Sequence, residues 1–368
     1  MKPIKININT NSDKYPIIIG SGLLTQIYSL LKKNAIDFEN CLLVIDKKVP
    51  KTLIGKILKS LSKKKVFVFF FNASEKNKNQ KTTNKILELL LKNNFHRADC
   101  IISIGGGITG DVAGFASSLF KRGINFVNVP TTLLAQVDSS IGGKTGINSK
   151  YGKNLIGSFY QPKLVLSDME FLKTLPKREI MCGYGEILKH SLINSKQFFM
   201  FLDKNASKVL NLQSPFIEKS IYQSCIIKKR IVEIDEKEKN LRMILNFGHT
   251  FAHAYEAAFG YSNKLNHGEA VLLGILNASK FCLKIKLMQI SEFKLIQRHL
   301  LKYNLIKKLN KKFNDNDIKK FISFMLKDKK NNNKKINLVL LKKIGKPIFN
   351  SRFDKRILHS FLKNELIN

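Results

Sequence analysis

The chain has few of the residues that stabilise secreted proteins. Its 368 residues include only five cysteines, Cys41, Cys100, Cys182, Cys225 and Cys282. They lie far apart, are odd in number and form no C-x-x-C pair. This spacing argues against a disulfide framework and against a zinc knuckle, and it is typical of reduced thiols in the cytosol.

Long apolar runs are absent as well. No run approaches the roughly 18 apolar residues that a membrane span needs. The N-terminal sequence MKPIKININT contains no apolar block of the kind that a signal peptide carries. We therefore expect a cytoplasmic protein that has no membrane partner.

Acidic residues are scarce, since 27 Asp and Glu stand against 64 Lys and Arg, which gives a formal net charge of +37. Such a charge could indicate nucleic-acid binding. The lysines, however, are scattered along the whole chain beside an excess of asparagine and isoleucine, as a coding bias towards A/T-rich codons would produce. No basic recognition helix stands out. We expect no nucleic-acid partner, and the charge should instead attract small acidic ligands.

The length allows two domains, each with its own core. In the first half, short β-branched or aromatic runs alternate with helix-length segments, which predicts parallel strands and crossover helices in a Rossmann-like α/β domain. Beyond about Pro176 the strand pattern nearly vanishes and helices are expected, so we place the boundary near residues 170–180. The predicted strands are Ile4–Ile8, Pro16–Ile19, Cys41–Ile45, Val66–Phe71, Cys100–Ile104 and Phe126–Val129, and the predicted later helices are Glu179–Leu192, Pro215–Glu236, His249–Phe259 and Glu269–Lys284.

The stretch 105–154 combines glycine, threonine and charges of both signs. It opens with GGGITGD directly after a predicted strand. Glycines let a backbone approach a pyrophosphate, and the N-terminus of the following helix offers free N–H groups and a positive dipole end. Glycine triplets also make ordinary turns, but polar residues after neighbouring strands favour a nucleotide. The candidates are Asp46 for a ribose hydroxyl, Thr131 and Thr132 as hydroxyl groups, and Lys144 and Lys153 for phosphate.

Histidine is rare, with seven in the chain, yet three lie within nineteen residues. His249 and His253 are four apart on one helical face, His267 follows, and Glu186 lies upstream, one turn before Lys189. Two histidines, one carboxylate and an open position suit zinc chemistry on oxygen ligands. Spacing alone leaves two ligand sets open, either His249 with His253 or His249 with His267 and Glu186. The remaining histidines are interpreted as structural: His96, His190, His299 and His359.

Five long blocks occur in order along the chain: GGGITGDVAGF (105–115), PTTLLAQVDSSIGGKTGIN (130–148), GEILKH (185–190), LRMILNFGHTFAHAYE (241–256) and HGEAV (267–271). With shorter blocks between them, they make the chain similar to the 3-dehydroquinate synthase family along nearly its whole length. Blocks of this length in this order are very specific. The departures are mild: Ala252 stands where the family usually has glycine, Gly185 replaces an alanine, and the loop before His267 is slightly longer.

The resemblance implies a dehydroquinate synthase-like fold, with an α/β NAD-binding domain of residues 1–175 and an all-α metal- and substrate-binding domain of residues 176–368. It implies zinc, which cobalt could replace, held by Glu186, His249 and His267, so that His253 becomes a proton-handling residue. The implied NAD-binding residues are Asp46, Ser74, Glu75, Lys78, Gly107, Ile108, Thr109, Gly110, Asp111, Thr131, Thr132, Lys144, Lys153, Phe171, Leu172, Lys173 and Thr174.

The implied activity is conversion of 3-deoxy-D-arabino-heptulosonate 7-phosphate to 3-dehydroquinate and phosphate, the second step of the shikimate pathway, by a homodimer. The implied substrate-binding residues are Arg122, which reaches across the dimer interface, Lys144, Asn154, Lys189, Lys228, Arg242, Asn246, Lys329 and Lys330. The implied catalytic residues are His253, Lys144, Glu238, Asp138 and Asn154.

Three other functions compete with this one. The same fold hosts metal-dependent alcohol, glycerol and glycerol-phosphate dehydrogenases, which release NADH. A related cyclase would make an inosose or a valiolone, although Arg242, Asn246 and Lys228 argue for a substrate that carries a carboxylate. A basic nucleic-acid-binding or structural protein would not need three metal-type ligands beside a nucleotide loop.

Overall fold

The computed structural model describes residues 3–260, 264–306, 313–326 and 335–367. The chain forms two compact units. The first consists of Met1–Ile180 with Ile221–Lys237, and the second of Met181–Ser220 with Glu238–Asn368. The lysine pair Lys329 and Lys330 lies outside the described residues.

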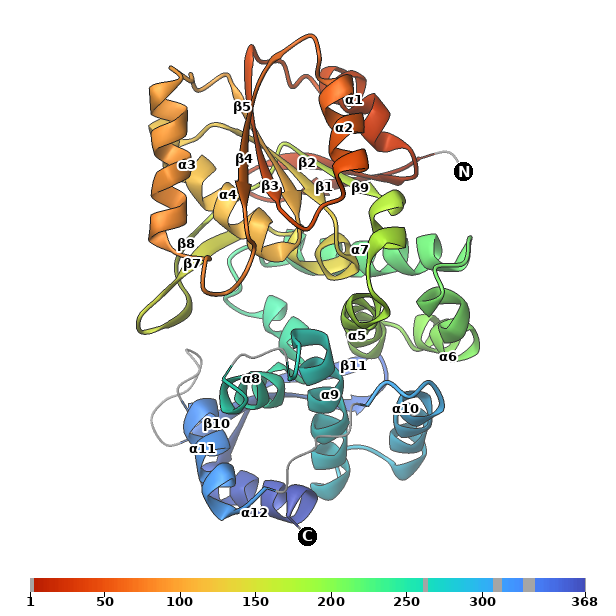
Figure 1. Cartoon of the computed structure of the whole chain (residues 1–368). Helices are drawn as coiled ribbons and strands as arrows, with labels where there is room; N and C mark the ends of the chain where they lie inside the picture. The colour runs from red at the N-terminus through yellow and green to blue at the C-terminus, as the bar shows by residue number, and fades with distance from the viewer. Residues whose placement is uncertain (1–2, 261–263, 307–312, 327–334, 368) are drawn as a thin grey trace. The chain divides into compact units, whose positions relative to one another are not determined.

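The first unit is built on a seven-stranded sheet with the order β1-β2-β9-β6-β5-β3-β4 (Figure 1). All neighbouring strands are parallel except β1 and β2, which a turn of four residues joins and which can therefore pair only antiparallel. The strands are β1 Ile4–Asn9, β2 Lys14–Gly20, β3 Asn40–Asp46, β4 Lys65–Phe71, β5 Cys100–Gly105, β6 Asn125–Pro130 and β9 Leu164–Asp168.

Helices cover both faces of this sheet. Successive side chains of β3 point to opposite faces and therefore join two different cores. Leu43 and Ile45 join the core beneath α1 and α2, whereas Leu42 and Val44 join the core beneath α3 and α4. In Figure 1 these two helix pairs lie on opposite sides of the strands. Central strands buried on both faces are typical of parallel α/β sheets, so the Rossmann-like prediction is confirmed. The helical segments are η1 Leu23–Gln26, α1 Ile27–Lys33, α2 Lys51–Ser60, α3 Gln80–Lys92, α4 Gly107–Leu119, η2 Phe120–Arg122, η3 Ala135–Ser139 and η4 Met169–Thr174.

Two further strands, β7 Lys144–Ser149 and β8 Gly152–Phe159, form a separate antiparallel hairpin in the first unit. The glycine-rich sequence of this segment predicted ligand binding, and neither strand was expected from it. The outer strand β8 exposes Leu155, Ile156 and Phe159, each by 43%.

The second unit is helical, and the four predicted helices are found as α5, α7, α8 and α9. It also contains a β-hairpin that the sequence analysis missed, made of β10 Lys335–Lys343 and β11 Lys346–Asp354. Within the described residues, no helix is sufficiently long and apolar to span a membrane. The helical segments are α5 Lys177–Asn194, α6 Lys196–Leu210, α7 Phe216–Ile234, η5 Leu241–Asn246, α8 His249–Ala258, α9 His267–Lys284, α10 Ile290–Lys302, α11 Asp315–Leu326 and α12 Lys355–Leu366. Most of α7, from Ile221 onward, belongs to the first unit.

Candidate active site

Three helices of the second unit bring metal-type side chains together. Glu186 comes from α5, His249 from α8 and His267 from α9, and one ligand atom of each lies within 4.8 Å of the others. The Nε2 atoms of His249 and His267 are 3.4 Å and 3.6 Å from the same oxygen, Oε1 of Glu186. His253 lies beside this group, with its ring centroid 5.5 Å from that of His249. Of the two ligand sets left open by spacing, the geometry assembles the one that includes Glu186.

The surroundings of Glu186 fit a cation. Its side chain is completely buried, and neither carboxylate oxygen accepts a hydrogen bond of normal geometry from a described residue. It pairs with the Lys189 ammonium and lies beside the two imidazoles. Burial raises the pKa of Glu186, but Lys189 and His249 outweigh it and hold that pKa well below its usual value. A buried ionised carboxylate that lacks hydrogen bonds is costly unless a positive charge compensates it, so a divalent ion would suit this position.

The backbone around His267 is fixed by two local features. Asn266 and Glu269 form a capping box at the start of α9, with both hydrogen bonds 2.9 Å long. Gly268 then lies directly against α5: a Cβ at this position would be 2.2 Å from the Cα of Cys182. The Gly268 N–H also donates to the Cys182 sulfur at 3.1 Å. Only glycine permits this approach, which places the α9 ligand beside the α5 ligand.

A second close approach positions α8. Gly248, just before this helix, has φ +80°, a left-handed conformation that favours glycine. A Cβ on Gly274 of α9 would be 2.2 Å from the Gly248 carbonyl oxygen. The start of α8, and with it His249, is therefore held against α9.

Predicted substrate and catalytic residues surround the same group in the second unit. His253 and Asn246 line a small cavity of about 20 Å³ together with His249 and residues of the hairpin β10–β11. The Asn246 side-chain amide donates to Glu238 at 2.9 Å. Arg242 is 2% exposed. The missed hairpin thus forms part of the wall beside the predicted proton-handling residue.

In the first unit, the glycine loop joins β5 to α4 and is closely packed. A Cβ on Gly105 would be 2.2 Å from Thr109 Oγ1, and one on Gly107 would be 2.8 Å from Ser139 Oγ. Helix α4 has no side-chain cap at its N-terminus, and the buried Thr109 hydroxyl has no hydrogen-bond partner among the described residues. Uncapped N–H groups at a helix start are suited to phosphate oxygens. The loop therefore fits the pyrophosphate of a dinucleotide.

The charged residues predicted to bind the nucleotide contact one another. Lys78 is buried and pairs with Asp111 and with the amide oxygen of Asn154. Lys153 pairs with Glu75 at 3.0 Å. Burial raises the pKa of Asp111, and the neighbouring Lys78 only partly offsets this. Burial also acts to raise the pKa of Glu75, but Lys153, Asn148 and Lys78 together outweigh it and lower that pKa.

The other predicted residues of the first unit lie at strand ends or turns. Thr131 donates its N–H to the Gly105 carbonyl at 2.9 Å, so the residues after β6 lie beside the glycine loop. The Lys228 ammonium contacts the Asp138 carboxylate and carbonyl at 2.6 Å each. The remaining positions are Asp46 at the end of β3, Thr132 after β6, Lys144 at the start of β7, the η4 segment Met169–Thr174, and Arg122 on an exposed turn with φ +64°.

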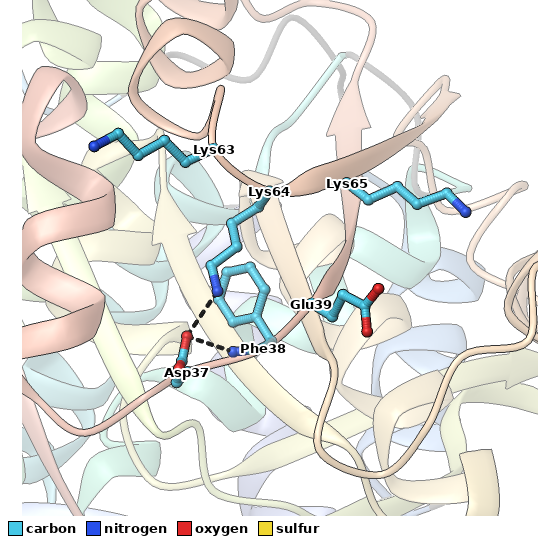
Figure 2. Close-up of a pocket in the computed structure, with 6 residues that line it drawn as sticks. All are labelled: Asp37, Phe38, Glu39, Lys63, Lys64 and Lys65. Carbon is cyan, nitrogen blue, oxygen red and sulfur yellow. Dashed lines mark hydrogen bonds and ion pairs between the residues drawn. The ribbon is translucent and has the colours of Figure 1, made fainter.

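An open hollow of about 600 Å³ lies at the opposite ends of β3 and β4, away from the glycine loop. Figure 2 shows Lys64 crossing the Phe38 ring to reach Asp37, which its Nζ contacts at 2.7 Å. Lys63 and Lys65 point away from this pair. The hollow contains none of the predicted site residues, and its central charges neutralise each other.

Comparison with known proteins agrees with this geometry. The family model described as 3-dehydroquinate synthase N-terminal matches residues 68–182, and the model described as 3-dehydroquinate synthase C-terminal matches residues 183–331. A 3-dehydroquinate synthase of Pelagibacter ubique is 61% identical over 363 residues, covering 99% of both chains.

Solved structures show the same fold. A 2-deoxy-scyllo-inosose synthase complexed with carbaglucose-6-phosphate, NAD+ and Co2+ matches with a TM-score of 0.88 and 25% identity, covering 98% of this chain and all of that one. A 2-epi-5-epi-valiolone synthase of Streptomyces hygroscopicus with NAD+ and Zn2+ bound matches in fold with a TM-score of 0.83 at 24% identity, covering 95% of this chain and 96% of that one. The two family models and the full-length relative show that the chain belongs to the 3-dehydroquinate synthase family.

Proposed function

We propose that the chain uses NAD and a divalent metal ion to convert 3-deoxy-D-arabino-heptulosonate 7-phosphate to 3-dehydroquinate and inorganic phosphate. As a member of its family it is a phosphate-eliminating lyase of the shikimate pathway. The observation that carries the metal requirement is the buried Glu186 carboxylate, which faces two imidazoles and accepts no hydrogen bond from the described part of the chain.

In the second unit, Glu186, His249 and His267 would hold the metal ion, with zinc as the proposed ion and cobalt as a substitute. When bound, the ion lowers the pKa of a hydroxyl group next to it, and NAD accepts and later returns a hydride. His253 lines the cavity next to His249 and is exposed, so its imidazole can accept or deliver a proton there. Glu238 holds the side-chain amide of Asn246 in place.

Charged residues would orient the doubly anionic substrate. Arg242 is suited to two-point contact with a carboxylate, whereas Lys189 and Lys228 act as point charges. Burial of all three side chains makes these contacts stronger than they would be in water. With NAD as hydride acceptor, oxidation of a substrate hydroxyl would acidify the neighbouring C–H and allow phosphate to leave. Return of the hydride, opening of the sugar ring and an internal aldol step would then form the carbocycle. The other residues proposed to contact substrate are Arg122, Lys144, Asn154, Lys329 and Lys330, with Asp138 holding Lys228.

In the first unit, the glycine loop would bind the pyrophosphate of NAD through the uncapped start of α4. Asp46 would accept a hydrogen bond from a ribose hydroxyl at the end of β3. Because the charged residues here already pair with each other, NAD would exchange contacts with them as it binds. The proposed NAD contacts are Ser74, Glu75, Lys78, Gly107–Asp111, Thr131, Thr132, Lys144, Lys153 and 171–174, which are the positions that the family resemblance implied.

We also propose a cytoplasmic homodimer. The exposed apolar side chains of β8 support an interface, because such patches on monomers are usually small. Arg122 supports it as well: it is exposed on a turn where both it and Lys121 have positive φ, and strained backbone is concentrated at functional positions. The five buried free thiols suit a reducing compartment.

The test is incubation with the heptulosonate phosphate, zinc and a small amount of NAD. We expect many phosphate ions released per NAD and no net rise in absorbance at 340 nm. Accumulation of one NADH per substrate would instead identify a dehydrogenase. Turnover of a sugar phosphate without a carboxylate, in preference to the heptulosonate phosphate, would identify a different cyclase.

A further inference from the structure

Glu256 contacts His267 on the side that faces away from Glu186. Its Oε2 lies 3.3 Å from His267 Nδ1, while His267 Nε2 lies 3.6 Å from Glu186 Oε1. The two ring nitrogens therefore meet two different carboxylates. Glu256 is 8% exposed and belongs to α8, the helix that also carries His249.

This contact decides which ring nitrogen is available to a cation. An ionised carboxylate only accepts hydrogen bonds, so Nδ1 of His267 must carry a hydrogen, and Nε2 is the nitrogen whose lone pair an ion can use once the proton there is displaced. His249 shows the same arrangement, since its Nδ1 lies 3.3 Å from the Phe247 carbonyl, which also only accepts. Both Nε2 atoms are thereby directed towards Glu186.

Glu256 restrains the orientation of the His267 ring, whereas other contacts restrain the His267 backbone. The capping box and the Gly268 contact fix the backbone of residue 267, but the His267 side chain remains 31% exposed. The side chain of His249, by comparison, is 12% exposed. Packing therefore restrains the His267 ring less, and a directional hydrogen bond has to hold it.

We propose that Glu256 is a positioning residue of the metal centre, which orients His267 and fixes the tautomer that presents Nε2 to the ion. The proposal rests on the proposed metal site. A carboxylate behind a ligating imidazole typically contributes about 10- to 100-fold to metal affinity. It also makes the imidazole a stronger donor, which the spectrum of bound cobalt reports.

The test is Glu256→Gln, with zinc affinity measured by competition against a chromophoric chelator and with the visible spectrum of the Co²⁺-loaded protein. A glutamine amide can donate or accept, so it enforces neither tautomer. We expect zinc affinity to fall about 10- to 100-fold and the cobalt bands to shift, while the metal-free protein still folds. Unchanged zinc affinity and an unchanged cobalt spectrum would overturn the proposal.

The matched control is Glu292→Gln, another carboxylate of the second unit, which pairs with Lys196 and the Ile344 N–H and touches no metal-type ligand. It should bind zinc as the unaltered protein does, and an equal loss in both variants would show that Glu256 has no special role. If Glu256→Gln does not fold, Glu256→Asp is the second variant: its shorter carboxylate withdraws from Nδ1, so an unaltered zinc affinity would overturn the proposal. Absence of zinc binding by the unaltered protein would instead reject the metal site itself.

Discussion

The predicted sites of the two units differ in how their charges are satisfied. In the first unit the charged residues form pairs, such as Lys153 with Glu75, and each has a partner within the chain. In the second unit the buried Glu186 pairs with the Lys189 ammonium, its oxygens accept no hydrogen bond from the residues that the structure describes, and two imidazoles converge on it. A ligand of the first site therefore exchanges existing contacts, whereas an ion at the second would be held by three converging ligand atoms. Single substitutions should consequently have graded effects in the first unit and all-or-none effects in the second.

The largest effect is expected from Glu186→Ala or His267→Ala. Each removes one of three ligands, so we expect zinc retention and activity to fall to background while NAD binding survives. Zinc per chain by atomic emission and NAD affinity by calorimetry check this. Zinc retained at full stoichiometry in either variant would contradict the ligand set.

A smaller effect is expected from Gly268→Ala. The new methyl group meets the α5 backbone at Cys182, and such overpacking costs about 1–3 kcal/mol of unfolding free energy. Because α5 must move away from α9, zinc affinity should fall as well. The control is Gly55→Ala in α2, where a Cβ meets nothing within 4 Å; it should stabilise the protein by up to about 1 kcal/mol. Equal changes in unfolding free energy in the two variants would contradict the close contact between Gly268 and Cys182.

Zinc affinity should also depend on pH. Burial lowers the pKa of His267, but the neighbouring Glu186 and Glu256 carboxylates outweigh it and raise this pKa to about 10 in the metal-free protein. Below that pKa zinc must displace a proton, so its affinity should fall about tenfold for each pH unit of acidification. The sign is opposite for the metal-free protein, whose stabilisation by the protonated ring is complete below the usual pKa of histidine and is lost as the pH rises towards 10. Chelator competition between pH 6 and 8 measures the slope, and a flat profile would contradict it.

The smallest effect on stability is expected from Lys153→Gln in the first unit. Its ion pair with Glu75 is partly exposed, with side-chain exposures of 24% and 41%, so unfolding free energy should fall by at most about 1 kcal/mol. If Lys153 contacts NAD, the affinity for NAD should nevertheless fall. Chemical denaturation and calorimetry separate the two quantities. A large loss of stability with unchanged NAD affinity would make Lys153 structural.

The sequence predicted the α/β unit because its central strands are continuous apolar runs between helices of the expected length. It did not predict β10, where Ile336, Leu338 and Leu340 alternate inward but the buried Leu341 interrupts the period and lysines flank the segment. The edge pair β1–β2 is antiparallel because of a short turn that the parallel pattern did not consider. The alternation of Ile4–Ile8 was sufficient to predict the half-exposed β1, whereas the lysine-flanked β10 was missed.

At the site, the ligand types were visible in the sequence, but their selection was not. Residue spacing could not choose between His253 and His267, since that choice depends on how closely α9 approaches α5. The sequence did not single out Glu256 as a metal-site residue, because a single glutamate on a helix is common. Its contact with His267 comes from the packing of α8 on α9. A search for carboxylates on helices that carry candidate ligands would have found it.

The sulfur of Cys182 is enclosed at the point where α5 meets Gly268, and the residue is 3% exposed. An alkylating reagent can therefore reach this thiol only when the two helices separate. The rate of modification at Cys182, followed by peptide mass spectrometry, would then measure how often this crossing opens. An ion bound to both Glu186 and His267 should slow alkylation of Cys182. The modification rate of this thiol would therefore report whether the metal site is occupied.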